Sequence, residues 1–232
     1  MNLGLLSLGF VIGMRHALES DHIAAVASLA TRSRSVADTL RQGAAWGVGH
    51  TLTLFLFGSV VLLLDSAVPE RTAQILELLV GIMLVILGAD VLLRLLRQRI
   101  HIHLHRHADG TLHLHAHSHA GEAEHPEVHH HPHRKTTALP LRALLVGTMH
   151  GMAGSAALIL LTLQSVHSPL TGLLYIALFG IGSIAGMVML SLVIAIPLRY
   201  SAVALDRLHD SLQAVIGLAT VTIGGLVIHG LT

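Results

Sequence analysis

The chain has 232 residues, of which 53% are hydrophobic and 12% charged, and its formal net charge is +1. A mean hydropathy of +0.70 predicts an integral membrane protein, because a soluble fold would leave the long apolar runs unexplained. The absence of cysteine excludes disulfides, thiolate metal sites and thiol-based electron transfer, and the near-zero net charge predicts no nucleic-acid partner.

The apolar runs predict an all-α polytopic membrane protein with six transmembrane helices. The expected spans, in chain order, are 3–30, 43–64, 75–96, 139–163, 170–197 and 212–229. They divide the chain into a first three-helix repeat (1–98), a histidine-rich loop (99–138) and a second three-helix repeat (139–232).

The first span contains an unusual cluster of ionisable residues, namely Arg15, His16, Glu19, Asp21 and His22. Ionisable residues at membrane depth are costly and indicate a functional site. On an unbroken helix, His16 lies about 140° from Asp21 and about 120° from His22, so the three side chains cannot meet at one ion. Either the helix unwinds between Ala17 and Asp21, or further ligands come from other helices. Two imidazoles and a carboxylate suit Ni, Co, Zn or Cu(II).

The supporting residues in this cluster are Arg15 and Glu19. Arg15 could neutralise Asp21 or Glu19 when no metal is bound, and Glu19 could instead be a transient ligand. The alternative for the whole cluster is an internal salt-bridge network that only fixes helix packing.

The stretch from Arg15-His16 to Asp21-His22-Ile23 resembles the His-x4-Asp-His motif of the nickel/cobalt transporter family. The resemblance implies that His16, Asp21 and His22 take part in metal selection and transport. The chain is similar above all to the short branch of that family, which includes the nickel permeases known as urease accessory proteins. It departs from the family pattern at Glu19 and Ser20, and it lacks a later Asp-Thr motif, so the ion and the transport direction stay open.

The two halves share glycine and histidine patterns. Gly13 to His16 matches Gly147 to His150, and Gly47 to His50 matches Gly180 to Ser183; Gly81 and Gly88 match Gly217 and Gly224. Three spans reverse the topology of the second copy, which predicts a 3+3 inverted repeat with a binding site between the copies. The plain alternative is that these glycines only let helices approach closely.

Histidines in the second and fourth spans are further candidates. His150 occupies the repeat position of His16, and both His150 and His50 are expected to complete the metal site; the alternative is a hydrogen bond to a neighbouring helix. Asp90 is expected to form an i,i+4 ion pair with Arg94. Trp46 is expected at the membrane interface.

Basic residues predict the orientation. Of the fourteen Lys and Arg residues, Arg71 alone falls on one side and Arg15 lies within a span, whereas all the others fall on the opposite side. The positive-inside rule therefore predicts a multi-pass protein of the cell (inner) membrane, with both termini outside and the loop in the cytoplasm.

Histidines alternate along the loop in two series, which are His101, His103, His105, His107 and then His113, His115, His117, His119. A period of two predicts strands, and Ala108-Asp109-Gly110 suits a three-residue hairpin turn. This register pairs His105 with His113, whereas a two-residue turn would set His105 opposite Leu114. The hairpin is expected to bind metal and to need metal for stability, and protonation near pH 6.5 would weaken loading. A flexible metal-binding tail follows, with His129, His130, His131 and His133; the alternative is a disordered linker.

The sequence thus predicts a transporter of a divalent transition-metal ion, nickel or cobalt first, with uptake ahead of export and alternating access as the mechanism. The expected partners are the metal ion, the lipid bilayer and a cytoplasmic metallochaperone, and no catalytic residue or catalytic cofactor is expected. Alternatives are a zinc or other divalent-metal transporter and a nickel/cobalt efflux protein. A remote alternative is a membrane metalloenzyme with Glu19 as general base.

Overall fold

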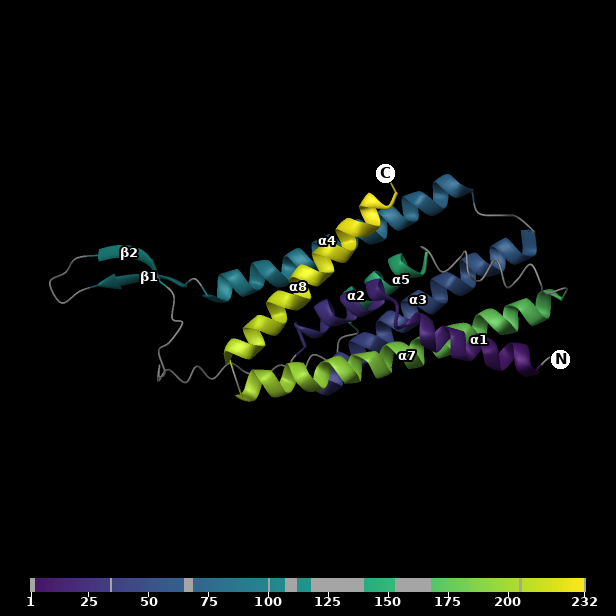
Figure 1. Cartoon of the computed structure of the whole chain (residues 1–232), viewed down its shortest axis with the longest axis horizontal. Helices are drawn as coiled ribbons and strands as arrows, with labels where there is room; N and C mark the ends of the chain where they lie inside the picture. The colour runs from purple at the N-terminus through teal and green to yellow at the C-terminus, as the bar shows by residue number, and fades with distance from the viewer. Residues whose placement is uncertain are drawn as a thin grey trace.

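The computed structural model describes residues 3–33, 35–64, 69–99, 101–106, 112–117, 140–152, 168–204 and 206–231. The helices in these ranges are α1 (Leu3–His16), α2 (Ser20–Ala30), α3 (Val36–Leu64), α4 (Glu70–Arg99), α5 (Leu141–Gly151), α7 (Pro169–Ala204) and α8 (Asp206–His229) (Figure 1). Two strands, β1 (His101–Arg106) and β2 (Leu112–His117), complete the described structure.

Four of these helices, α3, α4, α7 and α8, are long and apolar enough to cross a membrane. They leave large apolar side chains exposed, among them Leu56, Ile86, Val193 and Val215. An apolar surface of this kind suits lipid, since a bilayer hides it from water. The chain is therefore a helical membrane protein, while the predicted number of six spans stays a prediction.

The first and fourth predicted spans differ from continuous helices. The first consists of two helices, α1 and α2, which are separated by Ala17-Leu18-Glu19. The sequence left open whether this span unwinds or stays continuous, and the structure shows an interruption at the ionisable residues. In the fourth span, α5 ends at Gly151, and residues 153–167 lie outside the described part of the chain.

Apart from α2, the helices pack in two groups. In the first group, α3 packs against α7, α1 packs against α7, and α5 packs against α3; the second group is the pair α4 and α8 (Figure 1). The short helix α2 contacts α3, α4, α7 and α8, so it connects the two groups. Apolar residues from both groups and from α2 itself, including Leu29, Leu87, Val146 and Met187, form one buried core.

Glycines let the helices of the first group touch through their backbones. A Cβ atom added at Gly13 on α1 would overlap the carbonyl oxygen of Phe179 on α7, and one added at Gly147 on α5 would overlap the carbonyl oxygen of Trp46 on α3. Only glycine permits this approach, which agrees with the packing role of small residues in membrane helices. These two contacts fix the positions of the helices that end at His16 and near His150.

The strands β1 and β2 form an antiparallel hairpin, which projects beyond the end of α4 (Figure 1). The paired Cα positions are His101 with His117, His103 with His115, and His105 with His113. This is the register that the alternating histidines predicted, and it excludes the register that a two-residue turn would impose. The turn at 108–110 lies outside the described residues, as do His107, His119, His129, His130, His131 and His133.

Candidate metal centre

The interruption of the first span places two helix ends at one point. The chain leaves α1 through backbone hydrogen bonds from Leu18 N to Arg15 O (2.9 Å) and from Glu19 N to His16 O (3.1 Å). It enters α2 at Ser20, with Asp21 in the first turn. The carboxylate of Asp21 accepts a hydrogen bond from the backbone N–H of His22 (2.9 Å), and a negative charge is favoured at a helix N-terminus.

Four histidines from four helices converge beside this interruption. His16 ends α1, His22 lies in the first turn of α2, His50 lies within α3, and His150 lies in the last turn of α5. Their exposed fractions are 4%, 1%, 0% and 3%, respectively. The ring centroids are 4.4 Å apart for His16 and His22, 4.2 Å for His22 and His150, and 5.3 Å for His22 and His50. The structure thus brings together all the membrane-site histidines that the sequence predicted.

The cluster contains two overlapping sets of potential metal ligands. One set is His16, His22 and His50, and the other is Asp21, His22 and His150; within each set, one donor atom per residue lies within 4.8 Å of the others. Three imidazoles, or two imidazoles and a carboxylate, are donor sets that borderline divalent ions accept. His22 belongs to both sets and lies at the centre of the cluster.

Two carboxylates orient three of the rings. Glu19 Oε1 lies 2.9 Å from His16 Nδ1. Asp21 lies between the other two, with Oδ1 3.1 Å from His22 Nδ1 and Oδ2 2.8 Å from His150 Nε2. Because an ionised carboxylate only accepts hydrogen bonds, each of these ring nitrogens donates. In a neutral imidazole, the opposite ring nitrogen then carries a lone pair.

Those opposite nitrogens are buried and have no hydrogen-bond partner among the described residues. They are His16 Nε2, His22 Nε2 and His150 Nδ1, and both ring nitrogens of His50 share this state. A buried polar atom without a partner is costly and needs an explanation. A metal ion would supply one, since ligating histidines commonly donate their other N–H to a carboxylate. In this arrangement, the carboxylate of Asp21 orients the rings of His22 and His150, and the free ring nitrogens face the ion.

Two of the three helix ends at the cluster favour a cation, while the positive N-terminus of α2 is met by the Asp21 carboxylate. α1 ends at His16, and α5 ends one residue beyond His150. The C-terminus of a helix has a partial negative charge, which stabilises a positive charge nearby. Two such ends meet at this cluster.

The structure corrects the prediction for Trp46. This residue was expected at the membrane interface, but it is fully buried, with its ring centroid 5.5 Å from that of His22 and 5.7 Å from that of His150. The sequence left open whether Arg15 neutralises Asp21 or Glu19; in the structure Arg15 is exposed, and within the described residues both carboxylates pair with histidines. The sequence could not resolve either case, because both depend on which way a helix face turns.

A cavity of about 290 Å³ leads to the cluster. Its polar wall consists of His16, Glu19, Asp21, His22, His150 and Glu77, and its apolar wall consists of Val80 from α4 and residues at the end of α8 and just beyond it. Among the described residues, no lysine or arginine lines it. Glu77 was missed by the sequence analysis, although an acidic residue within the third apolar run was a signal that could have identified it.

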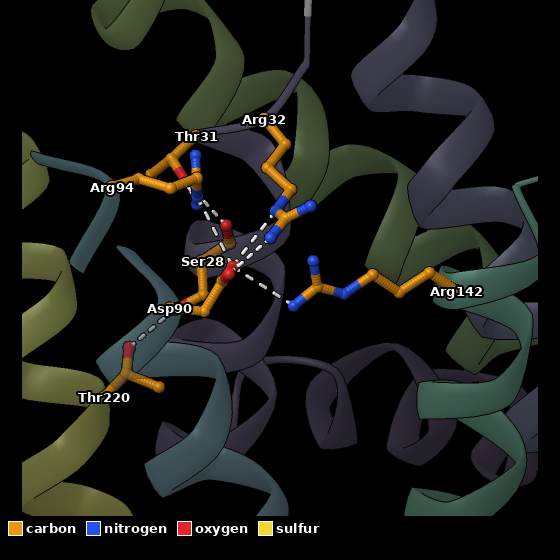
Figure 2. Close-up of polar contacts among 7 residues, drawn as sticks. All are labelled: Ser28, Thr31, Arg32, Asp90, Arg94, Arg142 and Thr220. Carbon is orange, nitrogen blue, oxygen red and sulfur yellow. Dashed lines mark hydrogen bonds and ion pairs between the residues drawn. The ribbon is translucent and has the colours of Figure 1, made fainter. Parts of the chain in front are cut away.

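The other end of α2 is held by a polar cluster around Asp90, which we call the Asp90 cluster (Figure 2). The carboxylate of Asp90 accepts hydrogen bonds from Arg32 Nε (3.0 Å) and Arg142 Nη2 (3.2 Å), and Asp90 Oδ2 lies 3.4 Å from Arg94 Nε. The predicted pair with Arg94 is therefore present, and Arg32 and Arg142 were not predicted. Through these residues, Asp90 connects α4 to the end of α2 and to the start of α5.

The chain is similar over nearly its whole length to the urease accessory protein UreH of Bacillus sp. (strain TB-90). The two are 35% identical over 226 residues, which cover 96% of this chain and 89% of the relative. The chain belongs to the UreH family. A shorter match, 39% identical over 83 residues, relates 35% of the chain to 22% of the chloroplast protein FOR GROWTH AND FERTILITY 1 of Arabidopsis thaliana. No protein-family model and no solved structure matches the chain.

Membership of the UreH family agrees with the resemblance to short nickel permeases that the sequence suggested. The histidine cluster lies on α1, α2, α3 and α5. For the loop histidines, the description extends only to the backbone register of β1 and β2.

Proposed function

We propose that this protein transports a divalent transition-metal ion across the membrane, with nickel or cobalt as the principal cargo, and that it is not an enzyme. The main support is the convergence of His16, His22, His50 and His150 at a helix interruption, with buried nitrogens that have no partner among the described residues. Interrupted helices at the midplane are a recurrent way to build ion sites in transporters. Kinship with a urease accessory protein fits a nickel-related role.

In this proposal, the unpaired nitrogens of the four histidines bind the ion in turn or together, and Asp21 and Glu19 orient their rings. Zinc is the second candidate cargo, because a cluster of imidazoles also suits zinc. Manganese fits poorly, since it prefers oxygen ligands.

Corresponding contacts in the two halves support an inverted repeat. Gly13 packs against the backbone carbonyl of Phe179, and Gly147 packs in the same way against the backbone carbonyl of Trp46. Likewise, the ring of His16 lies 5.4 Å from Phe179, and the ring of His150 lies 5.7 Å from Trp46. In the repeat alignment Phe179 corresponds to Trp46, so both contacts are the same contact made once in each half. Such a repeat provides two related conformations and hence alternating access.

The two sides of the site differ, which supports an outward-facing state. The cavity reaches the histidines from the side on which α4 begins and α8 ends. Towards the other side, Val26, Leu29 and Met187 belong to the packed core, and the Asp90 cluster lies beyond them. With the positive-inside orientation, the cavity opens to the outside. The resemblance to the short branch of the transporter family puts uptake ahead of export. The histidine loop then lies in the cytoplasm, where it would buffer metal or pass it to a metallochaperone.

Cellular metal content tests this function. We would measure nickel, cobalt and zinc by elemental analysis in cells that express the wild type, His16→Ala, His22→Ala or a deletion of 101–133. His209→Ala is the matched control, because His209 bonds to Ser201 and Gln213 outside the cluster. We expect the wild type to raise nickel or cobalt, and both cluster variants to abolish the rise, while the control retains it.

The same measurement separates the alternatives. A wild type that lowers metal content, with the same dependence on His16 and His22, would mean export. If only the zinc content changes, zinc is the cargo in place of nickel or cobalt. If cluster variants and wild type give equal contents of every metal, the transport proposal is wrong.

A further inference from the structure

Glu77 is an acidic residue that the metal-binding motif does not include. It lies on α4, seven residues after Glu70, which places it about 10 Å along the helix from its start. Its side chain is half-buried and lines the cavity together with His16, His22 and His150. No hydrogen bond or ion pair joins its carboxylate to another residue in the described ranges, whereas Glu19 and Asp21 are held by histidines. Glu77 is thus a carboxylate that remains available within the cavity.

Two features of the cavity indicate a cation as its occupant. The acidic residues along its wall are Glu19, Asp21 and Glu77, and the described residues place no lysine or arginine there to balance them. Independently, His16 and His22 line the cavity, are more than nine-tenths buried, and keep Nε2 without a partner in the described structure. Carboxylates in a confined, low-dielectric cleft focus the field and raise the local concentration of counter-ions.

We propose that Glu77 is a capture residue, which binds the incoming hydrated divalent cation through its carboxylate and passes it to the histidine cluster. This proposal rests on the function proposed above. A carboxylate oxygen can bind a cation that still has its water ligands. The imidazole nitrogens deeper in the site suit the borderline ion after it has released those waters. Glu77 therefore acts on the rate of arrival, and the histidines act on the strength of binding.

The single tryptophan of the chain allows capture to be measured directly. The ring centroid of Trp46 lies 5.5 Å from that of His22, so Ni²⁺ or Co²⁺ bound at the cluster should quench its fluorescence, whereas metal on the hairpin beyond the end of α4 should not (Figure 1). We would mix full-length purified protein with NiCl₂ or CoCl₂ in a stopped-flow instrument. Association and dissociation rate constants would be obtained at several ionic strengths for the wild type, Glu77→Gln, Glu77→Asp and Glu70→Gln.

We expect Glu77→Gln to lower the association rate constant about 3- to 10-fold, with a weaker dependence on ionic strength and an unchanged dissociation rate constant. Glu77→Asp keeps the charge and should stay near the wild type. Glu70→Gln removes a charge from the same helix at an exposed position outside the cavity, and it should also behave as the wild type.

Three results would overturn the capture role, namely equal association rates in Glu77→Gln and wild type, an equal loss in Glu70→Gln, or a change confined to the dissociation rate. Failure of the transport proposal looks different, because Trp46 would still be quenched with the expected Glu77 dependence while cellular metal content stayed unchanged. If neither Ni²⁺ nor Co²⁺ quenches Trp46 in the wild type, the capture proposal and the assignment of nickel or cobalt as cargo are both wrong.

Discussion

At the scale of single residues, the most informative side chain is Asp21, because one carboxylate orients two imidazoles. Its Oδ1 holds His22 Nδ1 at 3.1 Å and its Oδ2 holds His150 Nε2 at 2.8 Å. An asparagine has one acceptor oxygen and one donor nitrogen, so Asp21→Asn can keep only one of these bonds. The other ring would lose the partner that fixes its tautomer.

We therefore predict that Asp21→Asn weakens nickel binding about 10- to 100-fold, the usual range for the loss of a residue that orients a metal ligand. Titration of Trp46 fluorescence with NiCl₂ measures this affinity. Asp38→Asn, in the first turn of α3, is the control and should retain wild-type affinity. Equal affinity in Asp21→Asn would mean that the carboxylate has no part in orienting the ligands.

The sequence predicted these site residues unevenly, and the reason is geometric. The charges between Arg15 and His22 were visible because ionisable groups are rare in an apolar run. His50 and His150 stood out for the same reason, but their convergence depends on how α3 and α5 pack. The burial of Trp46 and the partners of Asp90 depend on the same packing, which no single-helix pattern contains. The hairpin register was predictable because it follows from spacing within one short segment.

At the scale of elements, the positions of α1 and α5 depend on close glycine contacts. Gly13→Ala would push α1 away from Phe179, and Gly147→Ala would push α5 away from Trp46, because the added Cβ overlaps a backbone carbonyl that cannot rotate away. Since these helices carry His16 and His150, a shift would also separate the proposed metal ligands. The proposed site therefore links helix packing to metal affinity.

We predict that each of these two substitutions destabilises the protein by about 1–3 kcal/mol, the usual cost of overpacking, and weakens nickel binding as well. Gly225→Ala is the matched control, since nothing lies within 4 Å of its added Cβ and alanine is the better helix former. Thermal unfolding in detergent and the Trp46 titration measure the two effects. If all three variants melt at the same temperature, the close contacts at Gly13 and Gly147 do not limit the packing.

At the scale of the whole molecule, the two ends of the protein are built differently. On one side the cavity reaches the histidines past Glu77. On the other side the Asp90 cluster ties α4 to the end of α2 and to the start of α5, the two short helices that carry His22 and His150 (Figure 2). For the site to open on that side, these helices must move relative to α4, so the contacts of Asp90 must break. Under the transport function and orientation proposed above, we infer that the Asp90 cluster stabilises the outward-facing state.

We therefore predict that Asp90→Asn shifts the population towards the state that is open on the cytoplasmic side, because an amide cannot hold three guanidinium groups. The absence of native cysteine permits a direct test. Ser191→Cys places a thiol at a fully buried position beside Gly43 on the Asp90 side of the cluster. A membrane-impermeant maleimide, applied to inside-out vesicles, should label Ser191→Cys several-fold faster in the Asp90→Asn background.

Arg97→Gln removes a charge at the same end without touching Asp90, and it should leave the labelling rate unchanged. Equal labelling rates in all three backgrounds would mean that the ion pairs of Asp90 do not control access, and that closure depends on the apolar core alone.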